Sequence, residues 1–313
     1  MLTNAVPLPT FANHETFHLR HAWLKKAYDA VAKDPGVFGR QDATITLGTG
    51  KNMVKSMRFW SVSCKVLRPS GDRKDPALQA TPVGRAIFRN RGGLDPYTEH
   101  PQTMWLLHWL LLAPPCRMPV WWIIMNELSG TNVRVDDMTE FVSQRVLNTA
   151  AWKTPSPKSL KKDIDVFLHT YSTYQGKLSM EDYIDCPFRG LHLVRQAERD
   201  TIRFVYGPKH GLTPLVVAYA CLDYASRLEL SAKSISVSRL ATEAGGAGQA
   251  FKLGERELAG LLDEAASKSD AIRIRNVNGS NHMVYGDAGE AAGAVLGQAY
   301  GKKGFVMPKG TVQ

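Results

Sequence analysis

The pattern of hydrophobic and polar positions repeats one order of elements along the chain: a short helix, a turn, a longer helix and a hairpin. Apolar residues recur at helical spacing in three longer stretches and predict helices at about 52–66, 158–171 and 253–266. Alternating apolar and polar residues predict hairpins at 190–207 and around the Asn278-Gly279 turn. The repeat therefore predicts three modules of similar construction.

Two helices followed by a hairpin are typical of helix-turn-helix proteins that carry a wing. We therefore expect an α+β fold that is mainly α with small β hairpins, built from tandem winged-helix-like modules. Proline-marked segments at 114–119 and 208–214 indicate the boundaries between them. The expected modules are 1–113, which includes linking helices, 114–210, and 211–313, which ends in a basic tail.

The most apolar stretch, residues 104–125, is interrupted by His108, Arg117 and three prolines, so it does not predict a membrane helix. It predicts a buried helix, a break and a second buried segment. The N-terminus lacks a basic region followed by an apolar run, so we expect no signal peptide. The four cysteines form no C-x-x-C pair, which argues against a disulfide framework and a zinc ribbon. We expect a cytoplasmic protein without a membrane partner.

The charge balance favours a polyanionic partner, which we expect to be double-stranded DNA. The chain has 39 Lys and Arg against 29 Asp and Glu, a formal net charge of +10 and a pI near 9.4. Cations on the helices at 52–66 and 158–171 repeat away from the apolar stripe, as phosphate contact requires. The residues expected to contact DNA on helices and hairpins are Lys51, Asn52, Lys55, Arg58, Lys158, Lys161, Lys162, Arg195, Arg203, Arg273 and Arg275.

These basic faces have other interpretations. A solvated helix surface explains the same cations, and Asp163 and Asp165 dilute the positive face of the helix at 158–171. The helix at 253–266 mixes cations with Glu and Asp, so it can equally be a packing surface or the interface of a homodimer.

One short motif suggests a different chemistry. Residues His14 to His18 match H-E-x-x-H, which on a helix places two histidines on one face to bind Zn²⁺, with Glu15 as the general base. No later helix offers an acidic third ligand in a clear register, and His21 lies too near to be that ligand. A zinc peptidase is therefore the third of our functional hypotheses.

Four strings in a fixed order carry a family resemblance. They are HETF, LR and WLKK within 14–26, LG and GKNMV within 47–54, GLDPY with Glu99 and Pro101 within 93–101, and WLLHWL at 105–110. Together they resemble a bacterial family long catalogued as a domain of unknown function, which includes the SspB-type proteins of single-strand DNA phosphorothioation defence systems. The resemblance covers roughly residues 11–290.

This resemblance implies a DNA-nicking component. Its expected partners are a cysteine desulfurase, an ATP-using sulfur transferase and an ATPase, which replace a non-bridging phosphate oxygen with sulfur on one strand. A DNA nicking endonuclease is our leading functional hypothesis. A non-enzymatic DNA-binding adaptor or regulator of the same fold is the second.

The resemblance does not supply an active site, so the chemistry of strand cleavage must nominate one. A metal or a base has to prepare water, and cations have to stabilise the charge on the phosphate. The candidate catalytic residues are His14, Glu15, Asp95 and Glu99, with Glu15 and Asp95 as ligands of Mg²⁺ or Mn²⁺. Each has a structural interpretation as well: a helix cap for Glu15, a turn for Asp95 and a solvated loop for Glu99.

Overall fold

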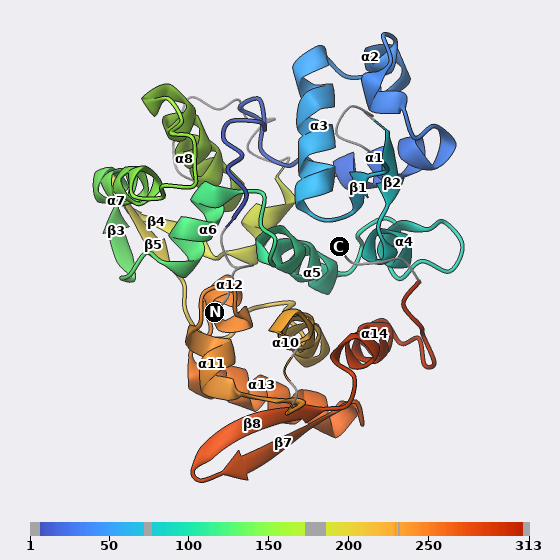
Figure 1. Ribbon diagram of the computed structural model, residues 1–313, viewed down its shortest axis with the longest axis vertical. Helices are drawn as coiled ribbons and strands as arrows, with labels where there is room; N and C mark the ends of the chain where they lie inside the picture. The colour runs from blue at the N-terminus through green and yellow to red at the C-terminus, as the bar shows by residue number, and fades with distance from the viewer. Residues whose placement is uncertain (1–6, 72–76, 173–185, 229, 231, 309–313) are drawn as a thin grey trace.

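The computed structural model describes residues 7–71, 77–172, 186–228, 230 and 232–308, arranged around two apolar helices at the centre (Figure 1). These helices are α5 (Pro101–Leu112) and α6 (Pro119–Asn126), joined by a segment that contains a cis Pro114–Pro115 bond. Every residue from 105 to 112 is buried. The predicted buried helix, break and second buried segment are therefore confirmed. Among the described residues, no helix is long and apolar enough to cross a membrane.

The N-terminal part packs two longer helices, α1 and α3, against each other. Its elements are α1 (Trp23–Lys33), η1 (Val37–Gly39), α2 (Ala43–Thr46), α3 (Lys51–Ser63), β1 (Leu67–Pro69), β2 (Leu78–Ala80) and α4 (Pro82–Phe88). The strands β1 and β2 form an antiparallel pair. Thr81 caps α4, because its side-chain oxygen accepts a hydrogen bond from the Gly84 amide at 2.9 Å.

The middle part places a helix pair on a small antiparallel sheet. Its elements are β3 (Asn132–Arg134), α7 (Val135–Leu147), α8 (Pro157–Tyr171), η2 (Pro187–Leu191), β4 (Val194–Glu198) and β5 (Thr201–Phe204). The sheet order is β3-β5-β4, so the strand that precedes the helices pairs with the last strand of the hairpin. The Ser156 side chain and Pro157 at the first turn fix where α8 begins.

The C-terminal part repeats this order of elements. Its elements are α10 (Pro214–Leu228), β6 (Ser234–Ser236), α11 (Val237–Thr242), α12 (Ala247–Phe251), α13 (Glu255–Lys268), β7 (Ile272–Val277), β8 (Ser280–Tyr285) and α14 (Ala288–Ala299). The sheet order is β6-β8-β7, and the residues Asn278 and Gly279 adopt the positive φ of a tight hairpin turn. Figure 1 shows this hairpin at the bottom of the view, away from α3 and α8.

The expected fold class, mainly α with small β hairpins, is confirmed. Two details differ. The first helix begins at Trp23 rather than near His18, because residues 13–16 form turns and Ala22 adopts a left-handed conformation with φ 61°. The strands β3 and β6, which each pair with a predicted hairpin, were not expected. Each has only three residues, too few to show an alternation of apolar and polar positions in the sequence. The module boundaries remain predictions.

Polar side chains on the buried helix α5 connect it to all of the later parts. The ring of His108 lies between the Tyr171 hydroxyl, at 2.9 Å from Nδ1, and the Ala250 carbonyl oxygen, at 2.8 Å from Nε2. The indole Nε1 atoms of Trp105 and Trp109 donate to the His210 carbonyl and to Asp223, both at 2.9 Å. Because a carbonyl only accepts, Nε2 of His108 carries the proton and Nδ1 accepts from the tyrosine.

This environment predicts an acid-sensitive fold. Burial lowers the pKa of His108 from its ordinary value of 6.5 to about 4. The unfolded chain therefore takes up a proton at this histidine below about pH 6.5, whereas the folded chain does not until about pH 4. The stability that the neutral His108 contributes is therefore complete above the unfolded-state pKa of 6.5 and is lost as the pH falls. Between pH 7 and pH 5 the free energy of unfolding should fall by about 2 kcal/mol.

Urea unfolding at these two pH values measures this loss. The variant His108→Gln should be less stable than the parent at neutral pH but lose less of its free energy of unfolding on acidification. An equal loss in both proteins would contradict the role given to His108.

Candidate nucleic-acid interface

Two basic helices, α3 and α8, lie on either side of the segment 11–17, which we call the N-terminal clamp. Figure 1 shows this dark-blue segment between the two helices. Three residues of the clamp adopt left-handed backbone conformations: Ala12 with φ 55°, Glu15 with φ 49° and Thr16 with φ 68°. The chain therefore turns repeatedly here, and its side chains reach both helices.

The clamp binds α8 through a buried histidine. Nε2 of His14 lies 2.7 Å from Oδ1 of Asp163, and the Ala12 amide donates to both oxygens of that carboxylate at 3.0 and 3.1 Å. Nδ1 of His14 accepts from the Thr16 amide at 3.1 Å, so Nε2 carries the proton and donates to Asp163. Both ring nitrogens of His14 are thus engaged within the protein.

The clamp binds α3 through two further contacts. The Glu15 carboxylate pairs with the Lys55 ammonium at 3.1 Å, and the indole of Trp60 donates to the Phe17 carbonyl oxygen at 3.0 Å. The first pair is partly exposed, whereas Trp60 is fully buried. The buried contact therefore fixes the position of the clamp on α3, and the exposed ion pair adds little to stability.

The helical H-E-x-x-H site is a prediction that the structure corrects. Residues 14–16 form turns and residues 17–18 have no regular secondary structure, so His14 and His18 do not share a helix face. Nδ1 of His18 lies 3.0 Å from the neighbouring Leu19 carbonyl oxygen. Within the part of the chain that the structure describes, no group of three or more His, Cys, Asp or Glu side chains is placed to hold a metal ion. The zinc peptidase hypothesis therefore has no metal site among the described residues.

The predicted DNA contacts occupy exposed positions on several elements. On α3, Lys51, Asn52 and Lys55 are exposed and Arg58 is half-buried, while Lys158 and Lys161 are exposed on α8 and Lys162 is half-buried. Arg195 on β4 and Arg203 on β5 are exposed and face each other across the hairpin. Like charges directly opposite on one sheet face repel each other.

The remaining predicted DNA contacts, Arg273 and Arg275, lie exposed on β7 in the hairpin distant from α3 and α8. The two sets therefore occupy different ends of the molecule, and the α3 and α8 faces form the candidate interface.

The candidate catalytic carboxylates have separate partners. Asp95 is buried and accepts hydrogen bonds from the Glu99 and His100 amides, at 2.9 and 3.0 Å, and from the Thr103 hydroxyl at 2.5 Å. It stabilises the start of α5, which is the turn role of an Asp-Pro sequence. Glu15 pairs with α3, and Glu99 is exposed. These contacts supply a structural role for Glu15 and Asp95 and leave their catalytic role a prediction.

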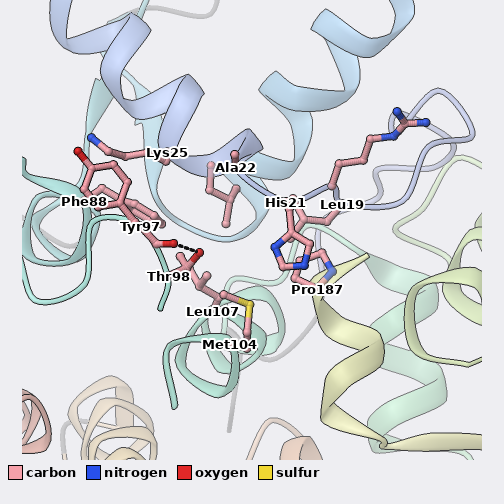
Figure 2. A pocket seen from close by; sticks show the side chains of 12 residues that line it. Leu19, His21, Ala22, Lys25, Phe88, Tyr97, Thr98, Met104, Leu107 and Pro187 are labelled. Carbon is pink, nitrogen blue, oxygen red and sulfur yellow. Dashed lines mark hydrogen bonds between the residues drawn. The ribbon is translucent and has the colours of Figure 1, made fainter. Parts of the chain in front are cut away.

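A pocket of about 250 Å³ is lined in part by residues that come directly after the clamp in the sequence (Figure 2). Apolar side chains line most of it, among them Leu24, Phe88 and Leu107. Figure 2 shows Lys25 and Tyr97 on one side of it, where the ammonium lies 5.4 Å from the centre of the exposed tyrosine ring. This lining suits a small apolar or planar group better than a charged phosphate backbone.

Comparisons with known proteins identify the family. Residues 11–300 match the model of a family described as Protein of unknown function (DUF4007). A solved structure described as SspB shares 33% identity and a TM-score of 0.87, covering 95% of this chain and 89% of its own. A second, described as magnesium ion-bound SspB, shares 33% identity and a TM-score of 0.86, with 94% and 89% coverage. The chain belongs to the SspB-type family. A comparison with curated proteins finds no match.

The match to the DUF4007 family model begins at residue 11, so it includes the whole N-terminal clamp. Sequence reasoning found His14 and Glu15 in this segment but missed Asp163, which it placed on the positive face of α8. Asp163 is in fact buried and points to His14. Asp163 lies three residues after the buried Leu160 and four before the buried Phe167, so it belongs to the apolar face of α8, and this spacing was the available signal.

The clamp yields a prediction about stability. Replacing His14 with Ala leaves the buried Asp163 carboxylate without its principal donor, so we expect the free energy of unfolding to fall by about 2–4 kcal/mol. The variant Glu15→Gln is the matched control, because it removes only the partly exposed pair with Lys55 and should cost less than about 1 kcal/mol. Urea unfolding compares the two. Equal costs would show that the His14 and Asp163 contact does not hold α8.

Proposed function

We propose that this chain is the DNA-nicking component of a bacterial phosphorothioation defence system. The observation that carries the proposal is the likeness to SspB structures over 94% of the chain at 33% identity. The cysteine desulfurase, sulfur transferase and ATPase that the resemblance implies are its proposed partners, and a homodimer is a further proposed contact.

The topology supports DNA binding by the α8 face. In the middle part, β3 is followed by the helices α7 and α8 and the hairpin of β4 and β5, with β3 paired to β5. We interpret this as a winged-helix module, in which the second helix of the pair is the one that enters the groove. That helix, α8, carries Lys158 and Lys161 on its exposed first turns.

The repeated module in the C-terminal part suits DNA less well. Its second long helix, α13, begins with two acidic residues, Glu255 and Glu257, and its Lys268 pairs with Glu264 at 2.5 Å. A helix whose first turn is acidic repels phosphates at the position where a recognition helix contacts them. We assign this module to packing or to a contact with another protein.

The divalent metal of the proposed nicking reaction is supported only by a relative, the magnesium ion-bound SspB. The residues predicted to hold it here do not fit that task in this structure. Both Asp95 oxygens already accept hydrogen bonds, Oδ1 from the Glu99 amide and Oδ2 from the His100 amide and the Thr103 hydroxyl. The Glu15 carboxylate pairs with Lys55. We therefore derive no step of the reaction from these two residues.

A non-enzymatic DNA-binding adaptor is the second candidate function. The same contacts favour it, because His14, Glu15 and Asp95 each have a partner within the fold. Both candidates require the basic faces of α3 and α8, so only an activity measurement separates them.

A plasmid assay separates the two candidates. Purified protein incubated with supercoiled plasmid and Mg²⁺ or Mn²⁺ should produce open circles, and a chelator should prevent them. Glu99→Gln tests the exposed candidate carboxylate, with Glu264→Gln on α13 as the control. If the parent produces no open circles under any metal condition while it binds the plasmid, the adaptor is the function.

Salt dependence tests the α8 face. The logarithm of the affinity for a DNA duplex falls linearly with the logarithm of salt concentration, and each lost phosphate contact lowers that slope by about 0.9. We expect the triple variant Lys158→Ala, Lys161→Ala, Lys162→Ala to have a clearly shallower slope. The control removes equal charge elsewhere, by Arg256→Ala, Lys268→Ala and Lys303→Ala. If both triple variants change the slope alike, only net charge matters and the α8 assignment is wrong.

A further inference from the structure

The pocket shown in Figure 2 lies where segments from different parts of the chain meet. Its walls come from the start of α1, the loop of Tyr97 and Thr98, the buried helix α5 and Pro187 of η2. Its volume of about 250 Å³ is below the roughly 300–1,000 Å³ of pockets that hold drug-sized ligands. The space therefore suits one small ring system rather than a whole nucleotide.

One wall carries an exposed aromatic ring that a buried cation holds in place. Tyr97 is 68% exposed, and the ammonium of the buried Lys25 lies 5.4 Å from the centre of its ring. The Asp29 carboxylate pairs with this ammonium at 2.6 Å, so Lys25 needs no further anion. Because a cation near the face of a ring attracts it, the Tyr97 ring is held in position although solvent reaches it. Such a ring offers a stacking surface to a planar group.

Another wall carries backbone donors that lack acceptors. The helix α1 begins after Ala22, which has φ 61° and makes no side-chain cap. The first amides of a helix have no acceptor within it and point out of its N-terminal end. Among the residues that the structure describes, the amides of Leu24 and Lys25 have no hydrogen-bond partner, and both residues line the pocket. A ligand in the pocket can therefore accept hydrogen bonds from α1.

These walls disfavour two kinds of ligand. The apolar side chains of Leu24, Phe88 and Leu107 would take water from a phosphate without replacing its hydrogen bonds. A wholly apolar group would leave the amides of α1 without a partner. A nucleobase satisfies both walls, because it has faces that stack and acceptor atoms along its edge. Pockets that hold a base outside the double helix combine the same two contacts.

We propose that this pocket binds one unpaired nucleobase of a DNA strand, an inference that rests on the proposed function. The base stacks on Tyr97, and its edge accepts hydrogen bonds from the amides of Leu24 and Lys25. The pocket begins two residues after the N-terminal clamp, which lies between the basic helices α3 and α8. A strand held by those helices can thus deliver a base to it.

Neutral nucleosides test the pocket without any phosphate contact. Thymidine and deoxyadenosine should raise the melting temperature of the parent as their concentration rises. Tyr97→Ala should weaken this binding roughly tenfold, because it removes the stacking surface, whereas Tyr97→Phe keeps the ring and should bind like the parent. Tyr206→Ala is the matched control, since Tyr206 is exposed and does not line the pocket. If the parent binds neither nucleoside, or if Tyr97→Ala binds both as tightly as the parent, the proposal is overturned.

A pair of DNA duplexes identifies the source of the base. The parent should bind a duplex with one unpaired thymine about tenfold more tightly than a fully paired duplex, because no base pair has to be broken. Tyr97→Ala should lose most of this preference, while Tyr206→Ala keeps it and all three proteins keep the same salt slope. A preference that is absent from the parent, or that survives in Tyr97→Ala, would overturn the assignment to DNA. If the parent binds neither duplex, the proposed function fails, and the nucleoside titration still decides whether the pocket holds a base.

Discussion

The neutral imidazole of His108 joins three parts of the molecule that are distant in sequence. It belongs to α5, accepts from Tyr171 at the end of α8, and donates to the Ala250 carbonyl in α12. A neutral ring with one donor and one acceptor satisfies both partners in a fully buried site, whereas a protonated ring would add a buried charge. The orientation of α8 relative to the core depends on this hydrogen-bonded centre and on the packing around it.

The candidate interface follows from that arrangement. α8 is held at Tyr171 by His108 and at Asp163 by His14, so its basic first turns extend outward from two fixed points. α3 is held to the same clamp by the buried Trp60. A backbone partner fixes the tautomer of each histidine: the Ala250 carbonyl can only accept from His108, and the Thr16 amide can only donate to His14. Buried hydrogen bonds thus position an exposed cationic surface.

Much of the fold could be predicted from the sequence, because periodic apolar residues record which face of a helix is buried. The central helices of the apolar stretch, α8 and the hairpin of β7 and β8 appear close to their predicted bounds. The helix α14 was not predicted, since its alanines and glycines give little periodicity; Gly293 and Gly297 instead lie against Met307 and Phe305. What the sequence could not show is the partner of a polar residue. Asp163 lies 149 positions from His14, and no local pattern links the two.

The strings that identify the family are largely strings that build the frame. His14 in HETF binds Asp163, Asp95 in GLDPY binds the start of α5, and His108 in WLLHWL joins α8 to α12. These three residues support the architecture, and a fold by itself does not define a reaction. These side chains are buried within the fold, whereas the cations and carboxylates exposed around the clamp are the groups that a phosphate backbone could reach.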